Sequence, residues 1–426
     1  EAYNNKGNAH RDLGEFDAAI DCYREAIKYK PNFAFFHYNL GLAFKAIGDL
    51  QEASESYKDA ITIEPDNAVI CYNMGNLLRA QGKFNQAIEN YERAIELNPE
   101  LFEAQVNLAD AFFHLRDFRR AKEILENLLE RTPSDPIILT NIGNLSIEMW
   151  ELARADTYLS GAVKNNPLSA DALQSLALAK AKLSNWDEVK ELSDRAIALG
   201  DSDNVWSHRL YLWIYHPDLT ADAICSEHIR WGEQFPEVSA DQFRWHDKTV
   251  SRRLRIGYVS PDFRGHSSRH YYDALFSQHD HERFEVYAYS NVLLKDEHTA
   301  RIETYFDGWH DIYFSDAKAV YELIRNDKID ILIDACGHMK DTRLDVFALK
   351  PAPIQVTWLG AAWKTGLKQI DYALFDRYMG QPDIQSSEEV IRLPNTWAAY
   401  RPNDKARKSP VTTLPALKNN QITFGY

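Results

Sequence analysis

A pattern of small, large apolar and proline positions recurs every 34 residues through the first 200 residues of the chain. Small residues let two antiparallel helices approach closely, large apolar side chains fill the space between them, and proline stops the second helix. The three most regular series are Pro31, Pro65, Pro99, Pro133 and Pro167; Gly7, Gly41, Gly75, Ala109, Gly143 and Ala177; and Tyr23, Tyr57, Tyr91, Leu125 and Leu159. The pattern predicts six two-helix units over residues 1–200.

This repeat resembles the tetratricopeptide repeat, which has the same period of 34 residues. Such units stack into a right-handed superhelix with a long concave surface. A superhelix of this kind normally binds polypeptides and performs no chemistry, so we expect a peptide-binding domain at 1–200.

An amide side chain recurs at one position of the first helix in five of the six units, with Ser175 in the sixth. The series is Asn5, Asn39, Asn73, Asn107 and Asn141. A primary amide can both donate and accept, so a row of them could hold the backbone of an extended peptide, at about 1 kcal/mol net per bond. The alternative is that these amides tie adjacent units together inside the stack.

Beyond Gly200 the 34-residue rhythm ends, and apolar runs typical of strands alternate with helical patterns. We predict a helical linker at 201–253 and an α/β, Rossmann-like lobe at 254–418, because near-continuous apolar strands separated by helices indicate a parallel sheet covered on both faces. The predicted strands are 254–260, 284–290, 309–314, 329–335, 353–360 and 372–376, and the predicted helices lie near 271–278, 300–306 and 317–326.

Three polar stretches follow predicted strands: "SPDFRGHSSRH", "DACGHMKDTR" and "WLGAAWKTG". Ligands of parallel sheets bind beyond the C-terminal ends of the strands, so these stretches predict an active site. The chain contains no G-x-G-x-x-G and no P-loop, which disfavours a dinucleotide site or an ATPase.

The first stretch carries Asp262, His266 and His270. The spacing does not suit a metal, because the two histidines are predicted on a loop and no H-E-x-x-H glutamate accompanies them. Asp262 could orient His266 as a general base, since the pKa of histidine lies near neutrality. Equally, Asp262 could cap the following helix and His270 could be a satisfied, partly buried histidine.

The second stretch carries His338, Lys340 and Arg343, a basic cluster suited to an anionic ligand such as a phosphate. Exposed charges at the start of a helix would give the same pattern.

Composition argues against some classes of partner and indicates a compartment. The chain has 426 residues and a net charge of −15, which argues against nucleic acid as a partner. Its four cysteines form no C-x-x-C pair, so we expect a reducing, cytoplasmic compartment. No apolar stretch reaches 18 residues, so we expect no membrane association. The chain starts in the middle of a repeat, which suggests that its natural start lies upstream.

Four segments resemble the nucleocytoplasmic protein O-glycosyltransferases. This family comprises the protein O-GlcNAc transferases, their bacterial relatives and the SPINDLY-type protein O-fucosyltransferases. The segments are "LRIGYVSPDFRGHSSRH", "DKIDILIDACGHMKDTRLDVFALKPAPIQVTWLG", "TGLKQIDYALFD" and "LPNTWAAYRPND". The asparagine ladder and the linker "YHPDLT" extend the resemblance over essentially the whole chain.

The resemblance implies a GT-B glycosyltransferase, in which two Rossmann-like lobes hold a nucleotide sugar, UDP-GlcNAc, without a metal or other cofactor. The acceptors implied are Ser and Thr hydroxyls of polypeptides that lie along the repeat groove. His266 matches the active-site histidine proposed as general base, Asp262 the nearby aspartate also proposed, and His270 a supporting histidine. Lys340 and Arg343 match basic residues of the cleft, and Leu359 with Gly360 match the segment beside the donor sugar.

The chain also departs from the family pattern. Ser267 and Ser268 stand where the family has Pro-Thr or Ser-Val, Met339 stands where it has threonine, and Trp363 with Lys364 interrupt a run like "GYPGTTG". Residues 419–426 resemble the start of a second lobe, which holds most nucleotide contacts in the family, so we expect this chain by itself to bind peptide and to be inactive in transfer. Two alternatives remain: transfer of fucose from GDP-fucose, which "YVSPDF" followed by His-Ser and "GWHDIY" favour, and a non-catalytic peptide-binding scaffold.

Overall fold

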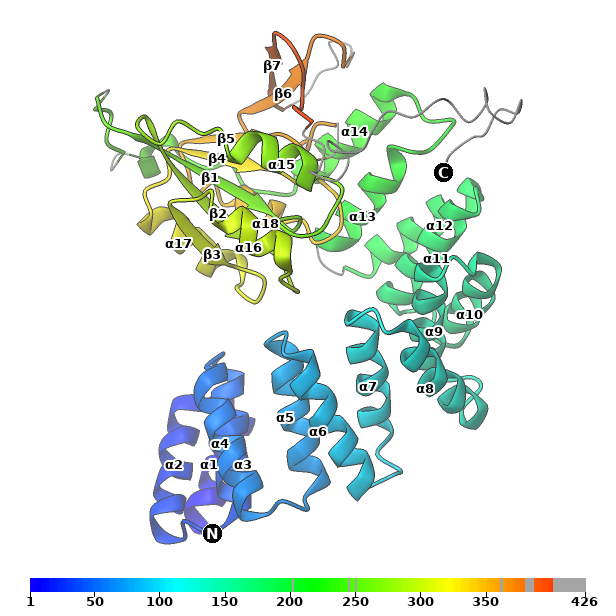
Figure 1. Cartoon of the computed structure of the whole chain (residues 1–426). Coiled ribbons are helices and arrows are strands. Elements are labelled where there is room, and N and C mark those ends of the chain that lie inside the picture. The colour runs from blue at the N-terminus through cyan, green and yellow to red at the C-terminus, as the bar shows by residue number, and fades with distance from the viewer. Residues whose placement is uncertain (201–202, 244–245, 250, 361–362, 380–386, 401–426) are drawn as a thin grey trace, which may run out of the picture. The chain divides into compact units, whose positions relative to one another are not determined.

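The computed structural model describes residues 1–200, 203–243, 246–249, 251–360, 363–379 and 387–400, and the predicted start of a second lobe at 419–426 lies outside them. The chain divides into two compact units, Glu1–His216 and Pro217–Tyr426. The first unit contains the helices α1 to α13, and the second contains the sheet (Figure 1).

The first unit consists of helices only. Twelve of its helices form six consecutive antiparallel pairs, and a thirteenth packs on the last pair. The helices are α1 (Ala2–Asp12), α2 (Phe16–Tyr29), α3 (Ala34–Ala46), α4 (Leu50–Ile63), α5 (Ala68–Ala80), α6 (Phe84–Leu97), α7 (Phe102–His114), α8 (Phe118–Arg131), α9 (Pro136–Glu148), α10 (Leu152–Asn165), α11 (Ala170–Lys182), α12 (Trp186–Ala198) and α13 (Asp203–Trp213). The predicted succession of tetratricopeptide repeats followed by an α/β region is confirmed.

The contact between the two helices of a pair explains the periodic glycine and tyrosine. A Cβ placed on Gly41 would lie 2.6 Å from the ring of Tyr57, and one on Gly75 would lie 2.6 Å from the ring of Tyr91. Both tyrosines are fully buried. The small residue is therefore required because the large ring of the facing helix occupies the space of its side chain.

The first helices of successive pairs contact one another, as α5 contacts α7 and α9 contacts α11. Each pair is also packed against the next, for example α6 against α7. Apolar clusters such as Cys71, Ala94 and Ala104 bury the junctions between pairs. The core of this unit is thus a row of small clusters, each built from residues fewer than 40 positions apart.

The second unit is built on a seven-stranded sheet in which every pair of neighbours is parallel, in the order β3-β2-β1-β4-β5-β6-β7. Its strands are β1 (Leu254–Ser260), β2 (Phe284–Ser290), β3 (Gly308–Asp311), β4 (Ile331–Asp334), β5 (Ile354–Thr357), β6 (Tyr372–Asp376) and β7 (Glu389–Leu393). Its helices are α14 (Ala221–Gly232), the 3-10 turn η1 (Ala240–Phe243), α15 (Arg269–Phe276), α16 (Glu297–Glu303), α17 (Ala317–Asn326) and α18 (Leu344–Ala348).

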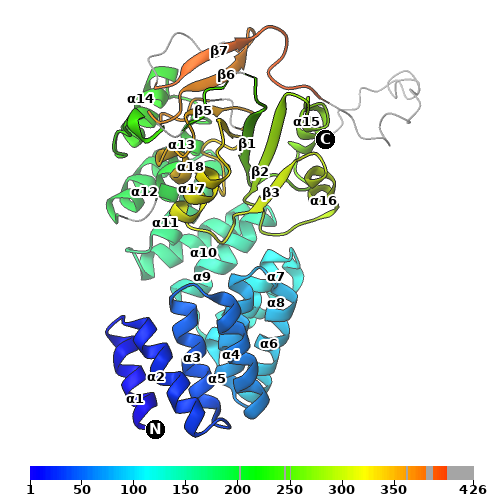
Figure 2. The ribbon, with the colours of Figure 1, turned by 90° about the vertical axis from the view of Figure 1, so that its left-hand side faces the viewer.

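Helices cover both faces of the sheet, with α15 and α16 on one face and α17 and α18 on the other (Figure 2). All six predicted strands form. The strand β7 and the helix α18 lie outside the predicted set, because an exposed edge strand and a five-residue helix give only weak hydrophobic patterns.

The region that the sequence pattern predicted as a linker, 201–253, is divided between the two units. The helix α13 contacts α11 and α12 in the first unit, whereas α14 belongs to the second. The second unit therefore starts before the predicted strand at Leu254. Within it, α14 lies directly against the loop after β5, where a Cβ on Gly232 would come within 1.9 Å of the carbonyl oxygen of Gly366.

Candidate active site

The strand order places three loops at one edge of the sheet. The chain runs from β1 to β2 and β3 on one side, then returns to β4, β5 and β6 on the other. Because all strands are parallel, the loops after β1, β4 and β5 leave the same edge, and the order reverses between β1 and β4. Ligands of open α/β sheets bind at this kind of reversal. The three polar stretches singled out from the sequence are these three loops.

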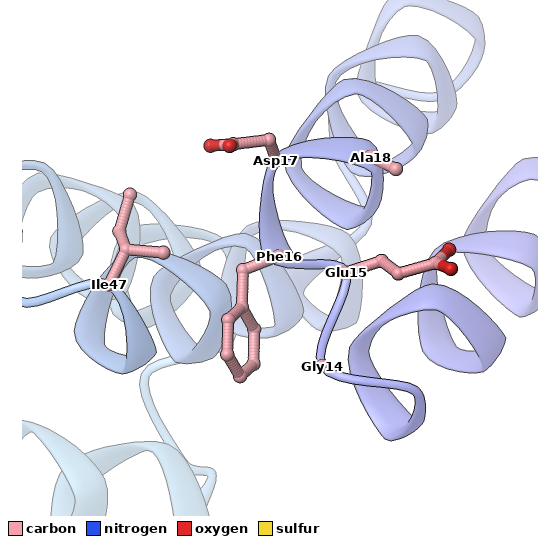
Figure 3. A pocket seen from close by; sticks show the side chains of 6 residues that line it. All are labelled: Gly14, Glu15, Phe16, Asp17, Ala18 and Ile47. Atoms are coloured by element: carbon pink, nitrogen blue, oxygen red, sulfur yellow. The ribbon is translucent and has the colours of Figure 1, made fainter.

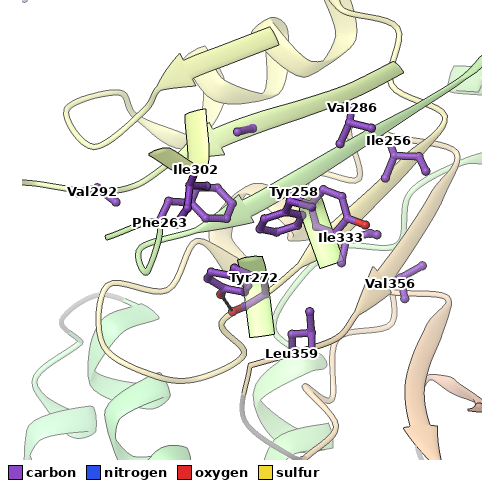
Figure 4. Close-up of a cluster of buried hydrophobic side chains, with 13 residues drawn as sticks. Ile256, Tyr258, Phe263, Tyr272, Val286, Val292, Ile302, Ile333, Val356 and Leu359 are labelled. Atoms are coloured by element: carbon purple, nitrogen blue, oxygen red, sulfur yellow. Dashed lines mark hydrogen bonds between the residues drawn. The ribbon is translucent and has the colours of Figure 1, made fainter. Parts of the chain in front are cut away.

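The loop after β1 is anchored by Phe263, which is fully buried in the core under α15 and α16. Figure 4 shows Phe263 close to Ile302, with Tyr272 on the neighbouring α15. The preceding residue, Asp262, is 6% exposed, and its backbone N–H donates to Ser260 Oγ at 3.0 Å. The anchor fixes the backbone of the loop between Asp262 and His266.

His266 lies at the outer side of this loop and faces Asp262. Its Nδ1 is 3.4 Å from Asp262 Oδ2 and 2.5 Å from Ser268 Oγ. The side chain of His266 is 38% exposed, whereas that of Asp262 is 8% exposed. The sequence interpretation that pairs Asp262 with His266 therefore fits the geometry, which points Nδ1 inward and leaves Nε2 on the outer side of the ring.

Burial raises the pKa of Asp262, because the carboxylate loses most of its hydration. The nearby His266 and Arg264 partly offset this rise in pKa, while Asp341 from the loop after β4 adds to it. Asp262 is thus a carboxylate that is costly to ionise unless a cation stands beside it. A protonated His266 is such a cation.

A second element holds the loop from outside. Asp296, the N-cap of α16, accepts a hydrogen bond from the backbone N–H of Gly265 at 2.7 Å with the oxygen that its capping bonds leave available. A Cβ on Gly265 would come within 2.7 Å of that oxygen. The residue before His266 is therefore a glycine because a carboxylate occupies the space of its side chain.

His270 lies apart from Asp262 and His266, on the first turn of α15. Its ring is partly buried and lies 5.3 Å from the ring of Tyr400. Its predicted supporting role in catalysis stays a prediction.

The loop after β4 is organised by Asp334, which the sequence interpretation did not single out. Asp334 is 2% exposed, and its carboxylate accepts bonds from Thr357 Oγ1 at 2.8 Å and from the backbone N–H groups of Cys336 and Gly337 at 3.0–3.1 Å. It joins the ends of β4 and β5. The only sequence signal for it was an acidic residue at the end of an apolar strand.

His338 does not take part in the basic cluster for an anionic ligand that the sequence predicted. It is 3% exposed, its Nε2 donates to the carbonyl of Thr365 at 2.7 Å, and its ring packs on His228 and Trp231 of α14. Desolvation lowers the pKa of His338 well below its usual value. The side chain is therefore neutral at pH 7 and adds no positive charge.

Arg343 is also turned inward. It is 8% exposed and donates to the carbonyls of Ile312 and Ser315 at 3.0–3.1 Å, as well as to the side chains of Asn291 and Asp345. Its donors tie the loop after β4 to the segment after β3. Lys340, by contrast, is exposed, and none of the described residues forms a hydrogen bond or ion pair with its ammonium group. Lys340 is the member of the predicted cluster that can reach an anion.

The loop after β5 begins with a strained residue. Leu359 has φ of +66°, a left-handed conformation that costs a non-glycine residue about 1–3 kcal/mol, and its side chain is buried in the core shown in Figure 4. A Cβ on the following Gly360 would lie 2.4 Å from the carbonyl carbon of Cys336. The turn therefore presses the backbone after β5 against the loop after β4.

Further along, this loop is held by Glu388, which precedes β7. One carboxylate oxygen of Glu388 accepts bonds from Thr365 Oγ1 and from the backbone N–H groups of Thr365 and Gly366. Glu388 is a second buried acid that the sequence interpretation missed.

In the repeats, the asparagine series forms contacts between units. Asn39 Nδ2 donates to Asn4 Oδ1 at 2.9 Å, and Asn107 Nδ2 donates to Asn76 Oδ1 at 2.7 Å, so each bond joins adjacent units. Asn73 Nδ2 donates to Val69 O at 2.9 Å within its own helix and lies 3.2 Å from Tyr38 Oη. Among the described residues, nothing donates to the three Oδ1 atoms. The amide nitrogens can therefore join the units while the amide oxygens accept bonds from a peptide, as the predicted ladder requires.

Two hollows of the surface lie in the repeat unit. One is lined by Gly14, Glu15, Phe16, Asp17, Ala18 and Ile47, at the junction of the first and second helix pairs (Figure 3). The other lies between the fifth and sixth pairs. Neither contains a residue of the asparagine series.

The described residues contain no group of three or more His, Cys, Asp or Glu side chains placed to hold a metal ion. None of the helices in the described ranges is long and apolar enough to cross a membrane.

Comparison with known proteins identifies the domain that contains these three loops. Residues 220–399 match the model of glycosyl transferase family 41, and residues 7–48, 36–67, 75–115 and 103–134 match tetratricopeptide-repeat models. Residues 220–399 are a family 41 glycosyltransferase domain.

Curated relatives support the same assignment. The chain is 38% identical over 232 residues to a protein of Hordeum vulgare named probable UDP-N-acetylglucosamine–peptide N-acetylglucosaminyltransferase SPINDLY, covering 53% of this chain and 24% of that protein. It is 32% identical over 195 residues to the UDP-N-acetylglucosamine–peptide N-acetylglucosaminyltransferase of Caenorhabditis elegans, covering 44% and 16%. The chain thus spans about a quarter or less of these relatives.

Among solved structures, an O-GlcNAc transferase of Thermobaculum terrenum aligns with 93% of this chain and 57% of its own, with 22% identity and a TM-score of 0.41. The family 41 match begins at residue 220, so α14 is part of the family 41 domain.

Proposed function

We propose that this chain belongs to a protein O-glycosyltransferase that transfers N-acetylglucosamine from UDP-GlcNAc to Ser or Thr hydroxyls of polypeptides held along the repeats. The observation that carries the proposal is the Asp262–His266 pair in a family 41 domain, at the sheet edge where the strand order reverses. The names of the curated relatives support the choice of donor.

In the proposed reaction, the acceptor hydroxyl oxygen attacks the anomeric carbon of the sugar as the bond from that carbon to the UDP oxygen breaks. UDP leaves with the electron pair, and His266 Nε2 takes the hydroxyl proton. A single displacement of this kind inverts the configuration of the anomeric carbon. Asp262 stabilises the imidazolium that results, because the buried carboxylate lies 3.4 Å from Nδ1.

We propose that the reaction needs no metal ion, with cationic side chains in place of a metal at the diphosphate. Of the predicted basic cluster, we assign this role to Lys340, since Arg343 and His338 are buried and engaged. We also propose that the chain by itself transfers sugar poorly, because the resemblance assigns most nucleotide contacts to a second lobe.

The direct test is an assay of the full-length protein with a Ser/Thr-containing acceptor and either UDP-GlcNAc or GDP-fucose. The mass of the modified peptide identifies the sugar, since an N-acetylhexosamine and a deoxyhexose differ in mass. Transfer from UDP-GlcNAc supports the proposal. Transfer from GDP-fucose alone would overturn the assigned donor, and peptide binding without transfer or donor hydrolysis would favour a scaffold.

Fucose transfer is the second candidate, and one observation favours it. It is the resemblance of "YVSPDF" and "GWHDIY" to the SPINDLY branch of the family. The identity to the relative named SPINDLY does not decide the donor, because the name of that relative specifies N-acetylglucosamine. The two-donor assay separates the candidates.

The acceptor part of the proposal depends on the asparagine series. Replacing Asn39, Asn73 and Asn107 together by alanine should weaken binding of an acceptor peptide about 100-fold, at about 1 kcal/mol for each lost bond. Fluorescence anisotropy of a labelled peptide measures this change, with helix content by circular dichroism as the control for folding. Asn90→Ala, on the second helix α6, is the matched control. Equal affinity of the triple variant and the control would rule out peptide binding by the asparagine series.

A further inference from the structure

The segment that carries His266 is held on both sides by the N-terminal turn of α16. On one side, the backbone N–H of Gly265 donates to Asp296 Oδ2 at 2.7 Å. On the other side, Arg269 Nη1 lies 3.0 Å from His298 Nε2. A guanidinium only donates, so His298 accepts this bond through a nitrogen that carries no proton. Two residues of one turn therefore bond the two ends of the segment that has His266 inside it.

The turn of α16 is itself fixed to the sheet. The backbone N–H of Asn291, at the start of the segment between β2 and α16, donates to the carbonyl oxygen of Ser260 at 2.9 Å. Val292 is buried in the core of the domain, and Thr299, which completes the capping box with Asp296, is fully buried. The turn can therefore serve as a fixed point for the loop after β1.

We propose that Asp296 and His298 are positioning residues, which hold the loop after β1 so that His266 faces Asp262. The hold on the loop follows from the two bonds, whereas its effect on turnover rests on the proposed function. The side chain of His266 is 38% exposed, so contacts in the core restrain it only in part. A displacement of a catalytic group by about 1 Å can lower a rate by about 100-fold, so the two bonds matter for a group that takes a proton.

Asp296→Asn separates the hold on the loop from the cap of the helix. Asp296 uses Oδ1 for the backbone N–H groups of His298 and Thr299, and Oδ2 for Gly265. Asparagine has a single oxygen, which can keep the cap, and its NH2 group cannot accept a bond from Gly265. The matched control is Asp316→Asn, at the N-cap of α17 on the opposite face of the sheet (Figure 2).

A second pair of variants tests the other side of the segment. His298→Leu removes the acceptor of Arg269, and His298→Gln offers an amide oxygen in its place. Because the proposal depends on the bond to Arg269, the glutamine variant should recover most of what the leucine variant loses. A role of the imidazole ring in packing alone would leave both variants equally affected and would count against the proposal.

The first measurement is hydrogen exchange of the 426-residue chain by mass spectrometry, which needs no turnover. In Asp296→Asn, the amides of the loop after β1 should exchange about tenfold faster, because the N–H of Gly265 loses its acceptor. His298→Leu should have the same effect on this loop, whereas Asp316→Asn and His298→Gln should leave it close to the wild type. Unchanged exchange of the loop in both Asp296→Asn and His298→Leu would overturn the proposal.

The second measurement is turnover of the full-length enzyme. Asp296→Asn and His298→Leu should lower kcat about tenfold with little change in KM, because the turn holds the proposed base and not the substrate. Asp316→Asn should keep the wild-type kcat. Faster exchange of the loop with an unchanged kcat would overturn the positioning role. A wild type without transfer would contradict the proposed function, whereas the exchange measurement tests the hold on the loop independently.

Discussion

The two units of the molecule differ in how far apart in the chain their contacting residues lie. In the repeats, a contact such as Gly41 with Tyr57 returns 34 residues later as Gly75 with Tyr91, and each such contact joins residues close in the chain. In the family 41 domain, each loop at the sheet edge is unique and is held by residues from distant elements, as Gly265 is held by Asp296. The environment of a residue can therefore be predicted from the repeat period in the first unit, whereas in the second unit it depends on contacts with distant elements.

Within the family 41 domain, the loops after β1 and β4 differ in how their buried aspartates are bonded. Both contain an aspartate whose pKa is raised by burial, Asp262 in one and Asp334 in the other. The carboxylate of Asp334 accepts bonds from three residues, whereas that of Asp262 lies 3.4 Å from His266 Nδ1 and 3.9 Å from a guanidinium nitrogen of Arg264. A buried acid with its acceptors filled stabilises a loop, and one that faces a titratable group is suited to proton transfer.

The largest expected effect is on catalysis at the loop after β1. His266→Ala in the full-length enzyme should lower kcat by about 100-fold or more, because it removes the group proposed to take the proton. His270→Ala, which removes a ring that packs on Tyr400, should cost a few-fold at most. Initial rates of sugar transfer measure both variants. Equal and small losses would mean that neither histidine is the base.

The next largest effect is on stability at the loop after β4. Asp334→Ala should lower the free energy of unfolding of the family 41 domain by about 3 kcal/mol, because it leaves buried donors of Cys336, Gly337 and Thr357 without an acceptor. Hydrogen exchange followed by mass spectrometry reports this separately for peptides of each unit.

Asp262→Asn is the paired variant, and it should leave the domain as stable or slightly more stable while lowering kcat. Its raised pKa means that ionised Asp262 costs stability at neutral pH, and asparagine removes that cost. If Asp262→Asn destabilised the domain as much as Asp334→Ala, the distinction between the two loops would fail.

Acid should destabilise the family 41 domain before the carboxylates with lowered pKa titrate. Burial lowers the pKa of His228 to about 4, and that of His338 well below its usual value. Between pH 6.5 and 5 the unfolded chain binds protons that the folded chain does not, so stability falls with decreasing pH, by about 2 kcal/mol for His228 at pH 5.

Urea unfolding at several pH values measures this slope for the wild type and for His228→Gln, which does not titrate. The variant should show a shallower dependence over the same range. Identical slopes would show that His228 does not titrate between the folded and unfolded states in the way its burial implies.

The smallest expected effect compares two repeats that differ at one position. Tyr91 Oη donates to Asn76 Oδ1 at 2.8 Å, whereas the second repeat has Leu42 at the equivalent position and the buried Tyr57 Oη has no hydrogen-bond partner among the described residues. Tyr91→Phe should cost about 1 kcal/mol, and Tyr57→Phe should be neutral or stabilising. Thermal unfolding of the two variants makes the comparison, and equal losses would mean that the phenol of Tyr57 finds a partner in solution.

The sequence predicted most of the architecture. Regular spacing gave the helix pairs, and near-continuous apolar runs gave six of the seven strands, because burial of one face or both dictates these patterns locally. The predicted linker at 201–253 is divided between the units, because α13 packs on α11 and α12 while α14 belongs to the second unit, and such packing cannot be read from the sequence pattern.

The site was predicted in part. Asp262 and His266 were singled out, since an acid and a histidine four residues apart after a strand can meet on a loop. Asp334, Glu388 and Asp296 were missed, because an acid that binds backbone N–H groups of another segment looks like any polar residue at a strand or helix end. His338 and Arg343 were assigned to a basic cluster suited to an anionic ligand, because the sequence shows charges but not burial.

The sequence by itself determined the repeat architecture, the parallel sheet and the three loops at its edge, because each depends on the order of apolar and polar residues along the chain. Only the tertiary structure decided which polar residues in those loops have their bonding capacity filled. That property depends on partners brought together from distant elements, as Thr357 at the end of β5 is brought to Asp334 at the end of β4. No local pattern records such partners, and they distinguish the loop proposed to carry the chemistry from the loop whose acid is fully bonded.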